Sequence, residues 1–76
     1  MSFAFGPLTD DYGFTFTSTS DGAGGLILTC AKYGTVTVTA AQLADPETER
    51  LVQRVTDGQD VETNWGNLVS HMAGIG

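Results

Sequence analysis

The fold is decided by residues 12–39, which read YGFTFTSTSDGAGGLILTCAKYGTVTVT. In the first part of this stretch, Tyr12 to Ser18, aromatic residues alternate with small polar ones. This alternation predicts a half-buried strand, with Tyr12, Phe14 and Phe16 on one face.

The rest of the stretch predicts two more strands. Residues 18–25 are rich in Ser, Asp and Gly and predict a hairpin loop, after which Leu26 to Ala31 has β-forming character. Lys32 to Gly34 is typical of a tight turn, and Thr35 to Thr39 alternates Thr with Val. Residues 12–39 therefore predict a three-stranded antiparallel β-meander.

The N-terminal residues predict an additional element. Phe3 and Phe5 alternate with small residues, so Ser2 to Phe5 is expected to form a short strand or a docking arm that ends at Gly6-Pro7.

Two helix signals follow the meander. Thr39 and Gln42 fit a capping box, but Pro46 disfavours a helical Asp45, so the sequence leaves open whether residues 40–45 are helical. Asp45 is expected to cap a helix over Pro46 to Asp57.

That helix has a clear apolar stripe and a clear end. Leu51, Val52 and Val55 lie on one face, and Gly58 is a good terminator.

The last segment predicts another helix after a polar linker at residues 59–63. Asn64 is expected to cap it, Gly74 to end it, and Ile75 to fold back onto Val69. Its apolar face is expected to consist of Trp65, Leu68, Val69 and Met72.

Together these elements predict a small α+β fold. We expect a three- or four-stranded antiparallel sheet with two short helices packed on one face. A single domain over residues 1–76 would comprise an N-terminal strand or docking arm (1–11), the β-meander (12–39) and a helical part (40–76).

Composition excludes several function classes. The chain has 76 residues, nine acidic and three basic, for a formal net charge of −6, which repels phosphate backbones and anionic lipid surfaces. No apolar run is long enough to span a bilayer, and Met1 to Leu8 does not resemble a secretory signal. We therefore expect synthesis in the cytoplasm and no direct contact with nucleic acid or membrane.

No residue pattern predicts a catalytic, cofactor-binding or metal site. His71 is the only histidine and is expected at the surface, and Cys30, the only cysteine, is expected to be a buried core residue. Asp10 and Asp11 are expected to serve a turn rather than a catalytic pair.

Two surfaces remain as candidates for binding. Phe3, Phe5 and Trp65 are expected either to complete the core or, as residue types enriched at interface anchors, to contact a partner. A cluster of acidic residues could also form one acidic face that mimics nucleic acid, with these members: Asp45, Glu47, Glu49, Asp57, Asp60 and Glu62.

The leading hypothesis is a non-enzymatic assembly or accessory protein that binds protein chains, as an oligomer or within a larger assembly. Open sheet edges and a small core without a disulfide favour it. Residue usage is typical of a GC-rich bacterium or its phage, so a structural component, incorporated in a virion in the phage case, is one form of this hypothesis. The alternative is an acidic phage-encoded inhibitor that occupies a basic groove of a host enzyme.

Overall fold

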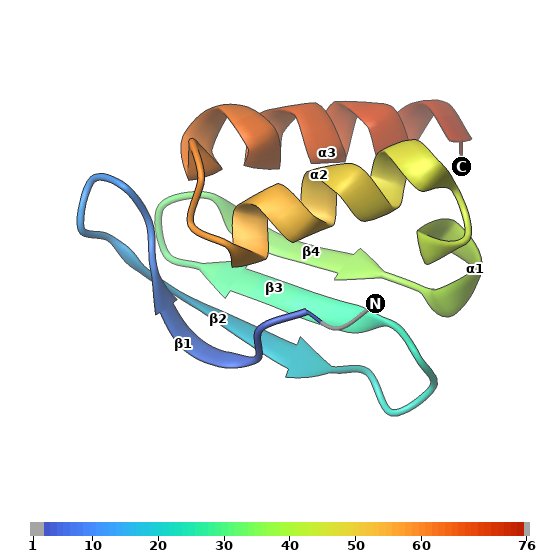
Figure 1. Ribbon diagram of the computed structural model, residues 1–76, viewed down its shortest axis with the longest axis horizontal. Coiled ribbons are helices and arrows are strands. Elements are labelled where there is room, and N and C mark those ends of the chain that lie inside the picture. Colours follow the sequence, from blue (N-terminus) through green and yellow to red (C-terminus); the bar gives the residue numbers. More distant parts are fainter. Residues whose placement is uncertain (1–2, 76) are drawn as a thin grey trace.

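Four consecutive strands form one antiparallel sheet in the order β1-β2-β3-β4 (Figure 1). The computed structural model describes residues 3–75, and the side chain of Ile75 lies outside the description. The strands are β1 (Gly6–Thr9), β2 (Thr15–Ser20), β3 (Leu26–Cys30) and β4 (Gly34–Val38). The sheet therefore contains the expected meander and one further strand on its N-terminal side.

Three helices follow the sheet: α1 (Ala40–Leu43), α2 (Pro46–Thr56) and α3 (Val61–Ile75). The two longer helices, α2 and α3, lie side by side over one face of the sheet (Figure 1). Short α1 lies at the end of the sheet where β4 leads into the helices. The chain is thus a small α+β fold with its helices on one side.

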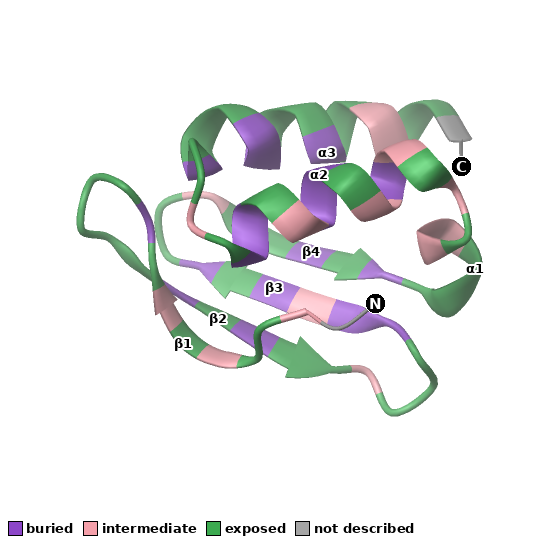
Figure 2. Cartoon of the chain, in the orientation of Figure 1, coloured by how far each residue is buried: buried purple, intermediate pink, exposed green. Residues whose placement is uncertain are grey.

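The core lies between the sheet and the two longer helices. Burial alternates along β3, where Leu26, Leu28 and Cys30 point inward and Thr29 is exposed (Figure 2). This alternation is the two-residue period of a strand with one covered face. The buried hydrophobic residues are Phe16, Leu26, Leu28, Cys30, Val36, Val38, Leu51, Val52, Val55, Val61, Trp65 and Leu68.

Local signals set the start of α1 and α2 where the sequence predicts them. The capping box of Thr39 and Gln42 is formed, so residues 40–43 are helical. Asp45 accepts a hydrogen bond from the Thr48 amide at 3.0 Å and caps α2, with Pro46 in its first turn. Carboxylates at helix N-termini satisfy free amides and complement the helix dipole.

The two N-terminal strands differ from the sequence-based prediction. The first strand covers Gly6–Thr9, directly after the expected Ser2 to Phe5, and Ser2 itself lies outside the described residues. A strand containing Pro7 is possible because β1 is an edge strand. The second strand begins at Thr15 rather than Tyr12, because the chain turns through Gly13, whose φ is 87°.

The last helix also differs from its prediction. α3 begins at Val61, and buried Asn64 lies in its first turn and donates from Nδ2 to the carbonyl of Gln59 at 2.8 Å. Val69 is 46% exposed, so it does not belong to the buried face. Gly74 lies within α3 and does not end it, and the expected contact of Ile75 with Val69 falls outside the described side chains.

The first prediction concerns the apolar stripe of α2. Leu51 is 4% exposed in the core, so Leu51→Ala should lower the free energy of unfolding by about 2 to 5 kcal/mol. Chemical denaturation followed by circular dichroism measures this loss. Glu49→Ala on the same helix is the control and should change it by less than about 0.5 kcal/mol. A Leu51→Ala protein as stable as the wild type would remove α2 from the core.

The second prediction concerns a buried hydroxyl in β2. Ser18 is 0% exposed, and its Oγ has no hydrogen-bond partner among the described residues. A buried polar group without a partner costs free energy, so Ser18→Ala should leave stability unchanged or raise it by about 1 kcal/mol. Thermal denaturation at neutral pH tests this. A clear fall in melting temperature would mean that the hydroxyl makes a stabilising interaction.

Candidate functional site

Three segments that are distant in the sequence meet at one end of the sheet. These are the loop between β1 and β2, the turn between β3 and β4, and the start of α3, all on the left of Figure 1. We call the side chains gathered there the aromatic end: Tyr12, Phe14, Lys32, Tyr33 and Glu62.

The carboxylate of Asp10 organises this end of the molecule. Its Oδ1 accepts hydrogen bonds from the amides of Tyr12 at 2.9 Å and Phe14 at 2.8 Å. Its Oδ2 accepts a hydrogen bond from the hydroxyl of Tyr33 at 2.6 Å. One side chain, 5% exposed, therefore fixes the loop carrying two aromatic rings and the orientation of a third. The turn role expected for Asp10 is confirmed.

The surroundings of Asp10 favour its charged form. Burial by itself would raise the pKa of Asp10, but the hydrogen bonds from Tyr33, Phe14 and Tyr12, with a smaller contribution from Lys32, lower it below 3.8. The pKa of Tyr33 is raised above 10.0 by burial and by its hydrogen bond to the Asp10 carboxylate. Across the neutral pH range the pair is therefore an anionic acceptor and a neutral donor.

Lys32 lies among the three rings. Its Nζ is 4.2 Å from the ring centroid of Phe14, 5.5 Å from that of Tyr33 and 5.7 Å from that of Tyr12. Glu62 Oε2 is 3.8 Å from the same nitrogen. These distances are within the range of cation–π attraction.

The start of α3 is held in place from the same loop. Asp11 Oδ1 accepts a hydrogen bond from the amide of Val61 at 3.3 Å, across 50 residues of sequence. The carboxylate thereby satisfies a free amide at the helix N-terminus. Glu62, the next residue, is thus placed beside Lys32.

Two of the aromatic side chains are open to solvent although the loop is well fixed. Tyr12 is 64% exposed and Phe14 is 45% exposed. Tyr33 is instead partly buried, with its ring 5.2 Å from that of Trp65. The site can therefore offer apolar area and a cation to a partner.

Of the interface candidates expected from the sequence, only Phe5 is well exposed, at 54%. Phe3 packs against the core cluster, and Trp65 is 2% exposed. In the core, the Trp65 ring forms a perpendicular aromatic pair with Phe16, at a centroid distance of 5.9 Å. Trp65 therefore completes the core, and a contact of Phe3, Phe5 or Trp65 with a partner stays a prediction.

Four of the six expected acidic residues are used in separate interactions within the chain. Glu47 pairs with Arg50, and Glu62 with Lys32. Asp45 caps α2, and Asp57 accepts a hydrogen bond from Gln53 Nε2 at 2.9 Å. These pairings neutralise part of the charge that a nucleic-acid mimic would present.

Cys30 and His71 both have structural surroundings. Cys30 is 5% exposed, which confirms its expected burial. His71 Nε2 lies 2.7 Å from Asp45 Oδ2 and so links α3 to the cap of α2. This bond, followed by that from the Thr48 amide, lowers the pKa of Asp45.

The described residues contain neither a metal-binding cluster nor a membrane-spanning helix. Residues 3–75 contain no group of three or more His, Cys, Asp or Glu side chains arranged to hold a metal ion. Within the same residues, no helix has the length and apolar character needed to cross a bilayer.

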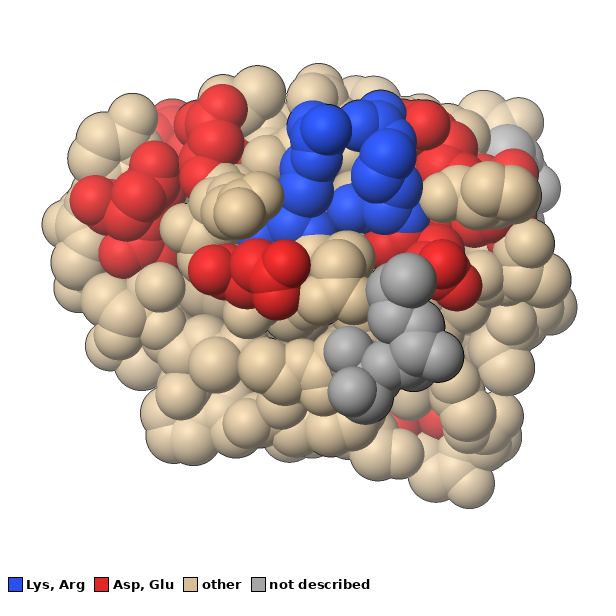
Figure 3. Space-filling model, in the orientation of Figure 1, with Lys and Arg blue, Asp and Glu red and all other residues tan. Residues whose placement is uncertain are grey.

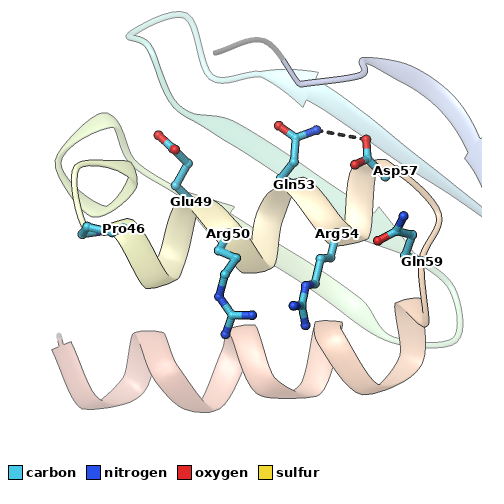
Figure 4. Close-up of a pocket in the computed structure, with 7 residues that line it drawn as sticks. All are labelled: Pro46, Glu49, Arg50, Gln53, Arg54, Asp57 and Gln59. Atoms are coloured by element: carbon cyan, nitrogen blue, oxygen red, sulfur yellow. Dashed lines mark hydrogen bonds between the residues drawn. The ribbon is translucent and has the colours of Figure 1, made fainter.

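A shallow depression of about 400 Å³ lies on the outer surface of α2. Its arginines, Arg50 and Arg54, point toward α3, whereas Gln53 and Asp57 lie along the other side of the helix (Figure 4). Figure 3 shows this basic area between acidic side chains. Arg50 is already paired with Glu47, and the depression is open to solvent. Its side chains therefore do not converge on one position that a ligand would occupy.

One sequence signal, Gly13, indicated the turn at the aromatic end, but the predicted strand over Tyr12 to Ser18 did not take it into account. Gly13 between Tyr12 and Phe14, after two aspartates, is typical of a turn. A turn there places the two aromatic rings outside the strand rather than on its core face. The positions of Tyr33 and Glu62 depend on contacts across the fold and have no local signal.

Comparison with protein-family models, with curated proteins and with solved structures finds no significant match. Function must therefore be argued from the geometry of the chain itself.

The third prediction concerns Asp10 and pH. The pKa of Asp10 is lowered in the folded state. The charged carboxylate therefore stabilises the fold above pH 3.8, and this stabilisation is lost as the pH falls below that value. Asp10→Asn should therefore lose less stability than the wild type between about pH 7 and about pH 3, measured by urea denaturation.

At neutral pH the same variant should be less stable than the wild type, because a neutral amide is a weaker acceptor for Tyr33. Asp21→Asn is a matched control, since Asp21 Oδ1 also accepts two backbone amides, those of Ala23 and Gly25. Within residues 3–75, Asp21 accepts no hydrogen bond from a tyrosine, so its replacement should cost less stability. Equal losses for both variants at neutral pH would contradict the role given to Tyr33.

Proposed function

We propose that the protein is a non-enzymatic domain that acts by binding other protein chains, and that the aromatic end is its contact surface. The observation that supports this most directly is the exposure of Tyr12 and Phe14 on a loop fixed by Asp10. Large aromatic side chains dominate the energetics of protein interfaces because they bury much area with little loss of side-chain freedom.

Rigidity makes this surface suited to binding. The amides of Tyr12 and Phe14 are already bound to Asp10, so the loop loses little freedom when a partner covers it. Ordering costs of this kind otherwise reduce affinity. A fixed pair of exposed rings is therefore a better anchor than the same rings on a mobile segment.

The edge of β4 adjoins the aromatic end and extends the proposed contact. β4 follows Tyr33 directly, is an edge strand, and contains neither proline nor a charged residue. An edge strand without such residues offers backbone groups to a partner strand. The opposite edge, β1, contains Pro7, which removes one donor.

An assembly or accessory role is the form of this function that we favour, with incorporation into a bacterial or phage particle as one instance. The inhibitor alternative draws less support, because Glu47 and Glu62 are paired with basic residues of the chain itself. Free carboxylates in one array would be needed to imitate a phosphate backbone.

The fourth prediction tests this surface with the double variant Tyr12→Ala/Phe14→Ala. The purified chain should self-associate or retain a protein partner in stoichiometric amount from an extract of its source cells. The double variant should weaken that association by about 30-fold or more, as expected when anchor residues contribute about 2 kcal/mol. Light scattering across a dilution series and titration with the recovered partner measure the change.

Val69→Ala is the matched control, because Val69 is also an exposed apolar residue, at 46%, but lies on α3 away from the loop. It should bind as the wild type does. A chain that stays monomeric at every concentration and retains no stoichiometric partner would refute the proposed function. Equal binding by the double variant would refute the proposed surface.

A further inference from the structure

The rings of Tyr12, Phe14 and Tyr33 all lie near one ammonium group. Lys32 Nζ lies 4.2 to 5.7 Å from the three centroids, and Glu62 Oε2 lies 3.8 Å from it. Several aromatic faces with a carboxylate form the chemical environment that proteins use to bind alkylated ammonium groups. We call these three rings and the Glu62 carboxylate the cage.

The walls of the cage are positioned by groups other than Lys32. Asp10 binds the Tyr12 and Phe14 amides and the Tyr33 hydroxyl, and Tyr33 packs on buried Trp65. Asp11 holds the first amide of α3, next to Glu62. The cage should therefore keep its shape when its present occupant leaves.

Lys32 is a weak occupant of this site. Its side chain is 39% exposed and that of Glu62 is 54% exposed, so water solvates their ion pair and the pair contributes little stability. A primary ammonium is also strongly hydrated, which opposes close contact with aromatic faces. A trimethylated ammonium is larger and less hydrated and gains more from the same rings.

We propose that the cage binds a methylated lysine side chain of a partner protein, and that Lys32 occupies it until the partner arrives. The inference deepens the contact function proposed above. It rests on that function because the partner protein supplies the methylated ammonium group. The formal charge of −6 favours a cationic ligand.

Exposure of the site favours a partner's side chain over a free small molecule. Tyr12 is 64% exposed, so the cage is shallow. Small-molecule sites are concave and bury most of their ligand. A shallow site instead suits a group presented by a polypeptide whose neighbouring residues contact the surface around it.

The fifth prediction follows from the competition by Lys32. Lys32→Ala should bind a trimethyllysine-containing peptide at least about tenfold more tightly than the wild type does. Amide chemical-shift titration by NMR measures both affinities and shows whether the fold is retained. The shifts should centre on Tyr12, Phe14 and Tyr33.

Two comparisons separate cation binding from simple apolar contact. The first uses the same peptide with a neutral carbon in place of the charged nitrogen, which should bind Lys32→Ala at least about tenfold more weakly. The second adds Phe14→Ala to Lys32→Ala, which should abolish binding, whereas Val69→Ala in the same background should not.

The proposal fails if natively folded Lys32→Ala shows no binding, or if the charged and neutral peptides bind it equally. It also fails if loss of Phe14 leaves the affinity unchanged. Because the assay uses a synthetic peptide, its result is independent of the partner experiment. Partner binding without peptide binding would leave the contact function standing and remove the cage.

Discussion

The carboxylate of Asp10 joins parts of the chain that the sequence keeps far apart. It binds two amides of its own loop and the hydroxyl of Tyr33, which lies 23 positions later. Tyr33 in turn packs on Trp65, and Trp65 packs on Phe16. The order of the exposed loop thus depends on a chain of contacts that ends in the hydrophobic core.

Carboxylates also hold the helix ends in place. Asp45 caps α2 and binds His71 of α3, and Asp11 binds the first amide of α3. A small chain whose only cysteine is free has to obtain order from such contacts and from packing. Much of its acidic composition therefore serves the fold rather than one charged binding face.

The proposed binding surface depends on this order. Exposed aromatic rings contribute more affinity when their loop is ordered before binding, because ordering a loop consumes part of the interaction free energy. Asp10 fixes the backbone that carries Tyr12 and Phe14, whose rings lie near Lys32 and are exposed to solvent. The proposed interface anchor and the proposed cation site both depend on this one arrangement.

The sequence by itself determined the α+β class, the meander, the caps of α1 and α2 and the burial of Cys30. These features follow from local patterns: alternation in a strand, and a capping residue followed by an apolar stripe. The sequence placed Trp65 on the apolar face of the last helix, but it did not place Tyr12 and Phe14 at the surface and did not bring Glu62 to Lys32. Those positions were decided by the tertiary structure, because they depend on hydrogen bonds and ring contacts between segments separated by tens of residues, which no local period encodes.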